Sequence, residues 1–339
     1  MIEIDGSLGE GGGQILRTAL SLSALTGKAF RIFSIRKARP RPGLMPQHLT
    51  AVRAAAQAAG ARVDGASQGS EELVFRPGRT SPGRYEFDIG TAGSTGLLFQ
   101  TLLPPLLFAG GRSGLLLKGG THVPWSPPFN YLKEVFLPML GRLGARVEAG
   151  IEAYGFYPRG GGRVSFGIEP SDGLRPADFL ERGRLLGVRG VSAAARLPLS
   201  VAQRQRQAAL EALGALAGAP VEVEALEVSS PGQGTFVFLR ADYEGAVCGF
   251  SALGARGKRA EEVGREAASA LLGHHASGAC VDAHLADQLA LYLALAGGES
   301  RVRTSAVTGH LSSNLRVIEM FLPVSSETDA ARGVVAIRG

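Results

Sequence analysis

The feature that most constrains this chain is an internal repeat with a period of about 84 residues. Residues 59–63 (AGARV) recur as residues 143–147 (LGARV), and residues 25–27 correspond to residues 108–110. Each copy has the pattern of a strand, a glycine-rich turn, an apolar helix, a second strand, a basic or proline-rich turn, a second helix and two strands. One such βαβαββ unit cannot cover its own sheet, so we expect the copies to pack together around their helices.

A third copy is displaced along the chain. Its first helix is predicted at residues 287–297, about 104 residues later than the period requires, which indicates an insertion at about 183–277. We therefore predict an α+β fold with α/β-like repeats: three βαβαββ-type repeats form a large domain, and the insertion forms a small α+β insert domain within the third. The large domain comprises residues 1–182 and 278–339. His122 and His310 are separated by one period plus the insertion, so they should occupy corresponding strand-to-helix turns.

Hydrophobic periodicity sets the bounds of the expected elements. The first two repeats should form helices at 14–26, 46–59, 94–109 and 127–143. The insertion should form strands at 185–195, 221–228, 235–242 and 245–252 and helices at 200–217 and 259–273. The insertion contains no catalytic constellation, so we expect it to be architectural, and we expect the adjacent His274 and His275 to lie at the surface.

The composition narrows the class of protein. Hydrophobic residues make up 45% of the chain, enough for a sizeable core, and the net charge of +6 is compatible with an anionic partner such as a nucleic acid or nucleotide. The two cysteines lack the spacing of a metal site, and the N-terminus lacks the pattern of a signal peptide. The apolar runs are too short to cross a bilayer. We therefore expect a cytoplasmic protein.

Residues 308–314 contain the first candidate for chemistry, His310. A strand is predicted at 301–307, and a helix should begin just after His310, with Ser312 or Ser313 as its N-cap, and stop at Pro323. An imidazole at a helix N-terminus lies where free N–H groups attract anions, so it can attack a phosphate or relay protons there. The alternative is a packed or surface histidine.

A glycine-rich segment, residues 6–17, joins the first strand to the first helix. It lacks the spacing of a dinucleotide fingerprint and the Lys-Ser/Thr pair of a P-loop. It therefore indicates either a general phosphate cradle or a structural turn. Glu10 could hold a divalent ion, and Arg17, one turn into the helix, could face the same turn.

The densest basic segment is residues 36–41, with four cations in six residues. Pro40 and Pro42 should hold it extended. Guanidinium groups match phosphate geometry, so Arg36 and Arg39 indicate an RNA- or phosphate-binding loop, and a solvated charged face is the alternative. Gln47 and His48 open the next helix, and an isolated histidine there is usually structural.

Two further helix starts carry polar side chains. Gln100 follows the anion-favouring segment 93–96. Asp287 and Gln288 should stand at the start of the third copy's first helix. The carboxylate there could orient an imidazole, hold a metal ion, or only complement the helix dipole.

Together these motifs resemble the RNA 3'-terminal phosphate cyclase family over nearly the whole chain. The matching segments are 5–17 (DGSLGEGGGQILR), 42–52 (PGLMPQHLTAV), 155–162 (GFYPRGGG), 285–289 (LADQL) and 310–323. The resemblance implies three βαβαββ-type units with a small insert in the third. It also implies that an RNA with a 3'-phosphate end is converted to a 2',3'-cyclic phosphodiester, with ATP as co-substrate and a divalent metal, Mg²⁺ or Mn²⁺.

The resemblance further implies a mechanism and roles for particular residues. The family's nucleophile aligns with His310, which attacks the α-phosphate of ATP to form a covalent histidine-AMP and release pyrophosphate. AMP then moves to the RNA 3'-phosphate, and the neighbouring 2'-OH displaces it. Asp287 would orient His310 and stabilise its positive charge. Of the other assigned residues, Glu10 would bind the metal, Arg36, Arg39 and Gln47 the RNA and its phosphates, and Arg17, Gln100, Pro127, His284, Leu285, Ala286, Asp287 and Gln288 the nucleotide.

The chain departs from the family at one position, since the family has a tyrosine where this chain has His284; an imidazole buries less area on adenine. Two other functions stay open. A catalytically silent relative that binds RNA in ribosome assembly would lack the nucleophile, so His310, Asp287 and Glu10 argue against it. A repeat-built carboxyvinyl-type transferase would need an anionic-sugar pocket, which these motifs do not predict.

Overall fold

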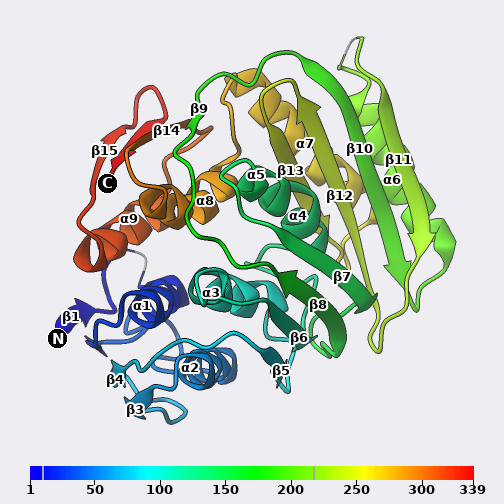
Figure 1. The fold of residues 1–339 in the computed structure, drawn as a ribbon. Coiled ribbons are helices and arrows are strands. Elements are labelled where there is room, and N and C mark those ends of the chain that lie inside the picture. Colours follow the sequence, from blue (N-terminus) through cyan, green and yellow to red (C-terminus); the bar gives the residue numbers. More distant parts are fainter. Residues whose placement is uncertain (10, 217) are drawn as a thin grey trace.

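Three small sheets surround a central group of helices, and a fourth sheet with two helices of its own packs beside them (Figure 1). The computed structural model describes residues 1–9, 11–216 and 218–339. At the centre, α1 (Gly13–Thr26) packs against α2 (Pro46–Ala58), α3 (Thr95–Leu107) and α9 (Gly309–Phe321). The remaining central helix, α8 (Ala283–Leu295), packs against α9. Among the described residues, every helix is too short or too polar to cross a bilayer.

Three of the sheets share one strand order. Taken in chain order, their strands are arranged first, second, fourth, third; the first two are parallel and the other neighbours antiparallel. The first sheet has β1 (Ile2–Asp5), β2 (Phe30–Phe33), β4 (Leu73–Arg76) and β3 (Arg62–Asp64); the second has β5 (Arg84–Asp88), β6 (Ser113–Gly119), β8 (Gly162–Ile168) and β7 (Val147–Ala153); the third has β9 (Asp178–Phe179), β14 (Glu299–Arg303), β16 (Val334–Arg338) and β15 (Ser325–Asp329). In the first two sheets a helix follows the first strand and another follows the second; in the third sheet α8 precedes the second strand and α9 follows it, and the residues of the fourth sheet lie between β9 and α8.

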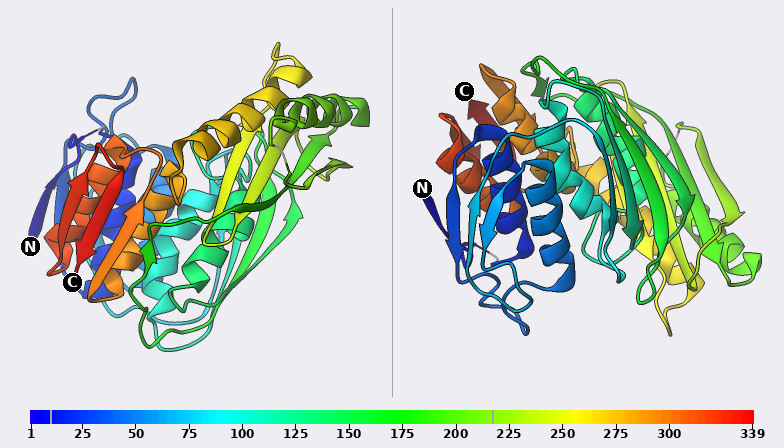
Figure 2. Two further views of the ribbon diagram at one scale, coloured as in Figure 1. Left: turned by 90° about the horizontal axis from the view of Figure 1, so that it is seen from above. Right: turned by 60° about the horizontal axis from the view of Figure 1, so that its bottom comes forward.

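The fourth sheet is formed by residues that lie between β9 and α8 in the chain. Its strands are β11 (Val221–Glu227), β10 (Leu185–Ala195), β12 (Gly234–Tyr243) and β13 (Val247–Leu253), in that spatial order. Figure 2 shows α6 (Leu199–Leu213) and α7 (Ala260–Ser277) together over one face of this sheet. Side chains of β12 alternate: Val237 and Leu239 pack under these two helices, whereas Phe236 and Phe238 join the core of the rest of the molecule. The fourth sheet is therefore buried on both faces along β12.

Most predicted elements agree with the structure in kind and closely in position. The helix expected at 287–297 begins at Ala283, so Asp287 lies in its second turn and Asp282 is its N-cap. The helix expected at 200–217 ends at Leu213, and residue 217 lies outside the described residues.

Three other predictions also differ from the structure. The helix expected at 127–143 is divided into α4 (Phe129–Tyr131), a π-helical turn (Leu132–Phe136) and α5 (Leu137–Gly141). The π-turn precedes Pro138, which has no N–H to donate to the carbonyl four residues earlier. The strand expected at 301–307 ends at Arg303, and α9 begins before His310.

The central helix α3 continues through Pro104 and Pro105. Pro105 cannot donate to the carbonyl of Thr101, and the hydroxyl of Ser21 on α1 donates to it instead, at 2.7 Å. Ser21 lies one turn after Arg17, and Thr101 directly follows Gln100, so this bond holds the parts of α1 and α3 that carry Arg17 and Gln100 in a fixed relation.

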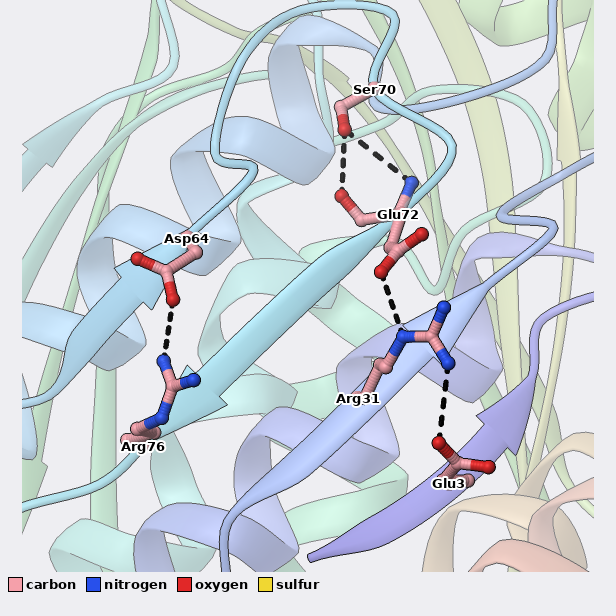
Figure 3. A network of polar contacts seen from close by, with 6 residues as sticks. All are labelled: Glu3, Arg31, Asp64, Ser70, Glu72 and Arg76. Atoms are coloured by element: carbon pink, nitrogen blue, oxygen red, sulfur yellow. Dashed lines mark hydrogen bonds and ion pairs between the residues drawn. The ribbon is translucent and has the colours of Figure 1, made fainter.

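The outer face of the first sheet is charged. Arg31 on β2 forms ion pairs with Glu3 on β1, at 3.2 Å, and with Glu72, at 2.7 Å (Figure 3). Its neighbours on β2, Phe30 and Ile32, face the other way and are fully buried. Exposed ion pairs contribute little to stability, so the buried face against α1 and α2 holds this sheet in place.

Candidate active site

A cavity of about 530 Å³ opens where the N-terminal turns of α1, α3, α8 and α9 approach one another. The free N–H groups and the positive dipole ends of helices favour anions at such a place. Seven residues singled out in the sequence line this cavity: Arg17, Gln100, Pro127, His284, Asp287, Gln288 and His310.

His310 is the second residue of α9 and is exposed. The predicted N-cap was wrong: Thr308 caps the helix, and its Oγ1 accepts from the N–H of Leu311 at 3.1 Å. The hydroxyls of Ser312 and Ser313 instead donate back to carbonyls of the preceding turn. The imidazole therefore lies within the first turn of the helix, and not in the loop before it.

The side chain of Gln14 joins His310 to Asp287. Nε2 of Gln14 donates to both carboxylate oxygens of Asp287, at 2.7 and 2.9 Å, and Oε1 of Gln14 is in hydrogen-bond contact with Nδ1 of His310. A carboxylate can only accept, so the amide nitrogen must face Asp287 and the amide oxygen must face His310. Nδ1 of His310 therefore carries the proton, and Nε2 keeps the lone pair that a nucleophile requires.

Asp287 is also held from its other side. Nδ2 of Asn314 donates to Oδ1 and to the main-chain oxygen of Asp287, both at 3.1 Å, and Oδ1 of Asn314 accepts from the hydroxyl of Thr18 at 2.8 Å. Burial raises the pKa of Asp287, while the hydrogen bond from Gln14 and the charge of His310 act in the opposite direction. The carboxylate thus has three donor contacts, and the main-chain oxygen a fourth, which fix Asp287 between α1 and α9.

Arg17 supplies positive charge one turn into α1. Burial lowers its pKa to about 10, and Asp287 opposes this shift, so the guanidinium stays charged at neutral pH. Its Nη1 atom lies 2.9 Å from the position that a Cβ on Gly13 would occupy. A cation therefore lies beside the first turn of α1, where helix N–H groups are free.

The glycines before α1 leave open a space that a side chain would fill. A Cβ on Gly12 would lie 3.4 Å from Nη2 of Arg39 and 3.9 Å from Cε1 of His310. A Cβ on Gly13 would clash with the imidazole of His48 as well as with Arg17. The bare backbone lets Arg39, Arg17 and His310 gather around one small volume, as a phosphate site requires.

The basic segment is a compact turn, so the prediction that Pro40 and Pro42 hold it extended was wrong. Its backbone bonds from Lys37 to Ser34 and from Arg39 to Arg36 close two turns. Arg36 has a left-handed φ of 56°, and its Nη1 donates to the carbonyls of Arg41 and Gly43, at 2.7 and 3.0 Å. Arg36 thus holds the loop, whereas Arg39 extends to the glycines beside His310.

Gln47 and His48, at the start of α2, have different surroundings. Gln47 lies against Gly93, with its Cβ 2.8 Å from the position that a Cβ there would occupy. His48 is buried, and its Nδ1 accepts from the N–H of Met45 at 3.2 Å. Burial and the nearby Arg17 lower its pKa to about 3. His48 is therefore neutral at physiological pH and caps its own helix.

The residues expected to bind the nucleotide divide into two groups. Gln100, Pro127, His284 and Gln288 line the cavity, whereas Leu285 and Ala286 are buried in the core and do not reach it. The Oε1 atom of Gln288 is buried without a hydrogen-bond partner among the described residues. A buried, unpaired acceptor in a cavity wall indicates a place for a ligand's donor.

Two other histidines are buried. His122 lies between Thr121, whose Oγ1 is 2.9 Å from Nδ1, and Asn130, whose Oδ1 is 3.1 Å from Nε2; burial lowers its pKa to about 3. His274 was expected at the surface, but it is only 4% exposed, because this position of α7 faces the fourth sheet and Phe250. Burial lowers the pKa of His274 to about 4.

Sequence reasoning assigned no role to several residues that line the cavity. Gln14 and Asn314 lie in segments that resemble the family, but their contacts could not be predicted, because their partners lie more than 270 residues away or on another helix. Trp125 lines the opening, and the segment Gly249 to Ser251 of the inserted residues forms part of the wall. The single tryptophan, which stands between two proline-containing turns, was the one signal available in the sequence.

The predicted metal ligand, Glu10, lies outside the described residues. Its neighbours Gly9 and Gly11 both have left-handed φ values, 55° and 56°. Within the described part of the chain, no three His, Cys, Asp or Glu side chains are grouped so that they could hold a metal ion.

The family model and the curated relatives that match this chain agree on one family. A family model described as RNA 3'-terminal phosphate cyclase matches residues 8–328. The RNA 3'-terminal phosphate cyclases of Pyrobaculum neutrophilum and Staphylothermus marinus are 48% and 47% identical to this chain, and each alignment covers 100% of this chain and 98% of the relative. A solved structure, the enolpyruvyl transferase NikO from Streptomyces tendae, is 12% identical to this chain. The match covers 100% of this chain and 82% of the NikO chain, and its TM-score of 0.29 is too low to support a conclusion.

The family match and the two relatives extend over almost the full length of this chain and of the relatives, and the segments that carry them include those that form the cavity. The chain therefore belongs to the RNA 3'-terminal phosphate cyclase family.

Proposed function

We propose that this protein converts an RNA 3'-terminal phosphate to a 2',3'-cyclic phosphodiester in an ATP-dependent reaction that passes through a covalent adenylate on His310. The observation that carries the proposal is the chain of hydrogen bonds from Asp287 through Gln14 to Nδ1 of His310. These hydrogen bonds leave Nε2 of the exposed His310 imidazole unprotonated. It lies beside the guanidinium groups of Arg17 and Arg39 and at a helix N-terminus. Family membership supports cyclisation of the 3'-phosphate.

In the first step, Nε2 of His310 attacks the α-phosphorus of ATP. A bond forms between Nε2 and phosphorus, the bond from this phosphorus to the bridging oxygen breaks, and pyrophosphate leaves with the electron pair. Nδ1 keeps its proton and the imidazole gains a positive charge. Asp287 offsets this charge through the amide of Gln14, and Arg17 and Arg39 offset the negative charge on the phosphates.

In the next steps, the adenylate moves to the RNA and then leaves. An oxygen of the RNA 3'-phosphate attacks the adenylate phosphorus, and the bond to Nε2 breaks and returns its electron pair to the imidazole. The ribose 2'-oxygen then attacks the 3'-phosphorus, its proton passes to solvent, and AMP leaves. The product is the 2',3'-cyclic phosphodiester, and His310 is restored for another turnover.

We assign the nucleotide to the cavity wall formed by Gln100, Pro127, His284 and Gln288. The unpaired Oε1 of Gln288 supports this assignment, because an amino or hydroxyl group of the nucleotide can donate to it. Leu285 and Ala286 would act only as buried supports for the flanking His284 and Asp287. Arg39 and Gln47 are proposed to bind the RNA, and Arg36 to hold the shape of the loop that carries Arg39.

We assign the divalent cation to Glu10 and the triphosphate. Bound there, Mg²⁺ or Mn²⁺ would neutralise charge on the leaving pyrophosphate. One carboxylate together with phosphates is a usual ligand set for Mg²⁺. Such a site does not require three protein ligands, and the described residues contain no group of three.

We expect Glu10→Gln to raise the metal concentration needed for half-maximal adenylation without changing the urea midpoint. Glu86→Gln on the exposed side of β5 is the control, and an unchanged metal requirement in Glu10→Gln would refute the assignment.

We also propose the organisation inferred from the sequence: three βαβαββ repeats in residues 1–182 and 278–339, and an insert domain at 183–277. The shared strand order of three sheets, with a helix after each of the first two strands, supports the repeats. The separate apolar cluster from Val188 to Leu271 supports the insert domain.

The proposed activity predicts how the RNA end responds to ATP. A 5'-labelled RNA with a 3'-phosphate should become resistant to phosphatase when protein, ATP and Mg²⁺ are added together. The same RNA with a 2'-deoxy sugar at its last nucleotide lacks the attacking oxygen, so it should accumulate as the adenylated species. Failure of the ribose substrate to become phosphatase-resistant would favour the catalytically silent, RNA-binding alternative.

A further inference from the structure

Trp125 lies at the opening of the cavity with its side chain almost wholly in solvent. It is the only tryptophan in the chain, it is 98% exposed, and it lines the cavity together with Arg17 and His310. Tryptophan is usually well buried, because it offers a large apolar area. Ligand binding would explain why this tryptophan is exposed beside a proposed phosphate-transfer site.

The backbone at Trp125 is held in an unusual conformation. Its φ is +58°, a left-handed value that bulky residues avoid and that is often retained where a ligand is bound. The residues on both sides are firmly placed: Val123 and Phe129 are buried, and the N–H of Phe129 donates to the carbonyl of Thr121 at 3.0 Å. Ser126 closes the turn by donating to the carbonyl of Val123, also at 3.0 Å.

This arrangement presents an aromatic ring from an anchored loop. Pro127, two residues on, packs against Gly96 at the start of α3, where a Cβ would lie 3.0 Å from the Pro127 carbonyl oxygen. The backbone at Trp125 therefore has a fixed position relative to Gln100, and the ring stands at the opening of the cavity, where a planar ligand can stack on it. A nucleobase is the ligand whose chemistry matches, because stacking on an aromatic ring is available to every base.

Two nucleotides must meet at His310 in the proposed reaction, the adenylate and the last nucleotide of the RNA. A cavity of about 530 Å³ is of the size that encloses one ligand. The ring of Trp125 lies at the edge of this cavity and faces solvent, as its exposure shows, whereas Tyr131 and Tyr292 in the cavity wall are buried. Of the two nucleotides, only the terminal one of the RNA stays joined to a polynucleotide that remains in solvent. Its base is therefore the one that meets the exposed ring.

We propose, resting on the proposed function, that Trp125 is the stacking platform for the base of the RNA's 3'-terminal nucleotide. This residue thereby places the 3'-phosphate beside His310 without contacting the reacting atoms. Because all four bases have a flat face, the platform accepts any RNA end and confers affinity without sequence preference.

The sole tryptophan gives a direct test by fluorescence. Binding of a short RNA with a 3'-phosphate should quench the emission of the wild-type protein, and the same RNA with an abasic 3'-terminal nucleotide should bind without this quench. Trp125→Ala should weaken binding of the 5'-labelled intact RNA by roughly 5- to 150-fold, the range measured for loss of one base–aromatic stack. Trp125→Phe should recover most of the affinity, and Trp125→Ala should not weaken binding of the abasic RNA.

Two outcomes would overturn the proposal. Equal weakening of intact and abasic RNA by Trp125→Ala would show that the ring does not act through the terminal base. A rise in the ATP concentration needed for protein adenylation without RNA, with RNA binding unchanged, would assign the ring to adenine. Adenylation itself is measured separately in wild type, so its absence there would refute the proposed function and would be distinguished from failure of the platform.

Discussion

At the scale of single residues, the account depends on the amide of Gln14. Asp287 determines which way this amide faces, and the amide determines which nitrogen of His310 carries the proton. The sequence predicted His310 and Asp287 as candidates, with the carboxylate orienting the imidazole. It could not predict that Gln14 lies between them, because the three residues belong to three helices whose relative placement is a tertiary property.

Asp287→Asn tests this arrangement. Burial raises the pKa of Asp287 above its unfolded value, so its contribution to stability is full below about pH 3.8 and is lost as pH rises through the raised pKa. At pH 7 the asparagine should therefore leave the urea midpoint unchanged or higher. Adenylation of the protein should fall on the order of 10²- to 10⁴-fold, as when a histidine loses the carboxylate that fixes its tautomer.

Gln14→Ala is the companion variant, because it breaks the same chain at its middle. It should also lower adenylation, whereas Gln57→Ala on the exposed side of α2 should not. Equal adenylation rates in wild type, Asp287→Asn and Gln14→Ala would show that the hydrogen-bond chain has no part in the reaction.

At the scale of elements, the sequence predicted most helices and strands but not how their ends are placed. Thr308, Ser312 and Ser313 can all cap a helix, and the choice depends on where β14 stops pairing at Arg303, which is decided by its neighbours β9 and β16. The turns of the basic loop were missed for a similar reason. They depend on bonds from Arg36 to carbonyls five and seven residues later, which no local pattern records.

The basic loop gives a prediction that separates its two arginines. Arg39 points to the glycines beside His310, so Arg39→Ala should lower the slope of log affinity for RNA against log salt by about 0.7, the value for one phosphate contact on a single strand. Arg36 donates to two carbonyls of its own loop, so Arg36→Ala should lower the free energy of unfolding by about 1–2 kcal/mol. Arg53→Ala, on the exposed side of α2, is the control. An unchanged salt slope in Arg39→Ala would remove this residue from the RNA surface.

At the scale of the whole molecule, the inserted residues do more than the sequence indicated. Period arithmetic predicted an insertion at about 183–277, but the contribution of Gly249 to Ser251 to the cavity wall depends on how β12 packs through Phe236 and Phe238. Successive side chains of β12 point to opposite faces of the sheet, and both faces of this strand are apolar. The sequence of such a strand does not reveal which face packs against α6 and α7 and which against the rest of the molecule.

Three buried histidines in separate parts of the molecule predict sensitivity to acid. The pKa values of His48 and His122 are lowered to about 3 and that of His274 to about 4, all chiefly by burial. Each folded pKa lies below the unfolded value of about 6.5, so the stability they contribute is present above that pH and is lost as pH falls toward the folded values. Each histidine should add about 1.4 kcal/mol per pH unit to the loss of unfolding free energy in this range.

Urea titrations between pH 7 and pH 5 measure this loss. His122→Gln should reduce the pH dependence by about one proton. If His122→Gln shows the same pH dependence as wild type, His122 is not the buried neutral group described above.

The central claim is that Nε2 of His310 forms a covalent bond to AMP, and incubation with α-labelled ATP and Mg²⁺ tests it most directly. Wild type should retain the label on the protein after denaturation, through a phosphoramidate that is labile in acid and stable in base. His310→Ala and His310→Asn should retain none while unfolding at the same urea concentration as wild type, and His122→Gln should still be labelled. A labelled His310→Ala protein, or a wild type that acquires no label, would contradict the account.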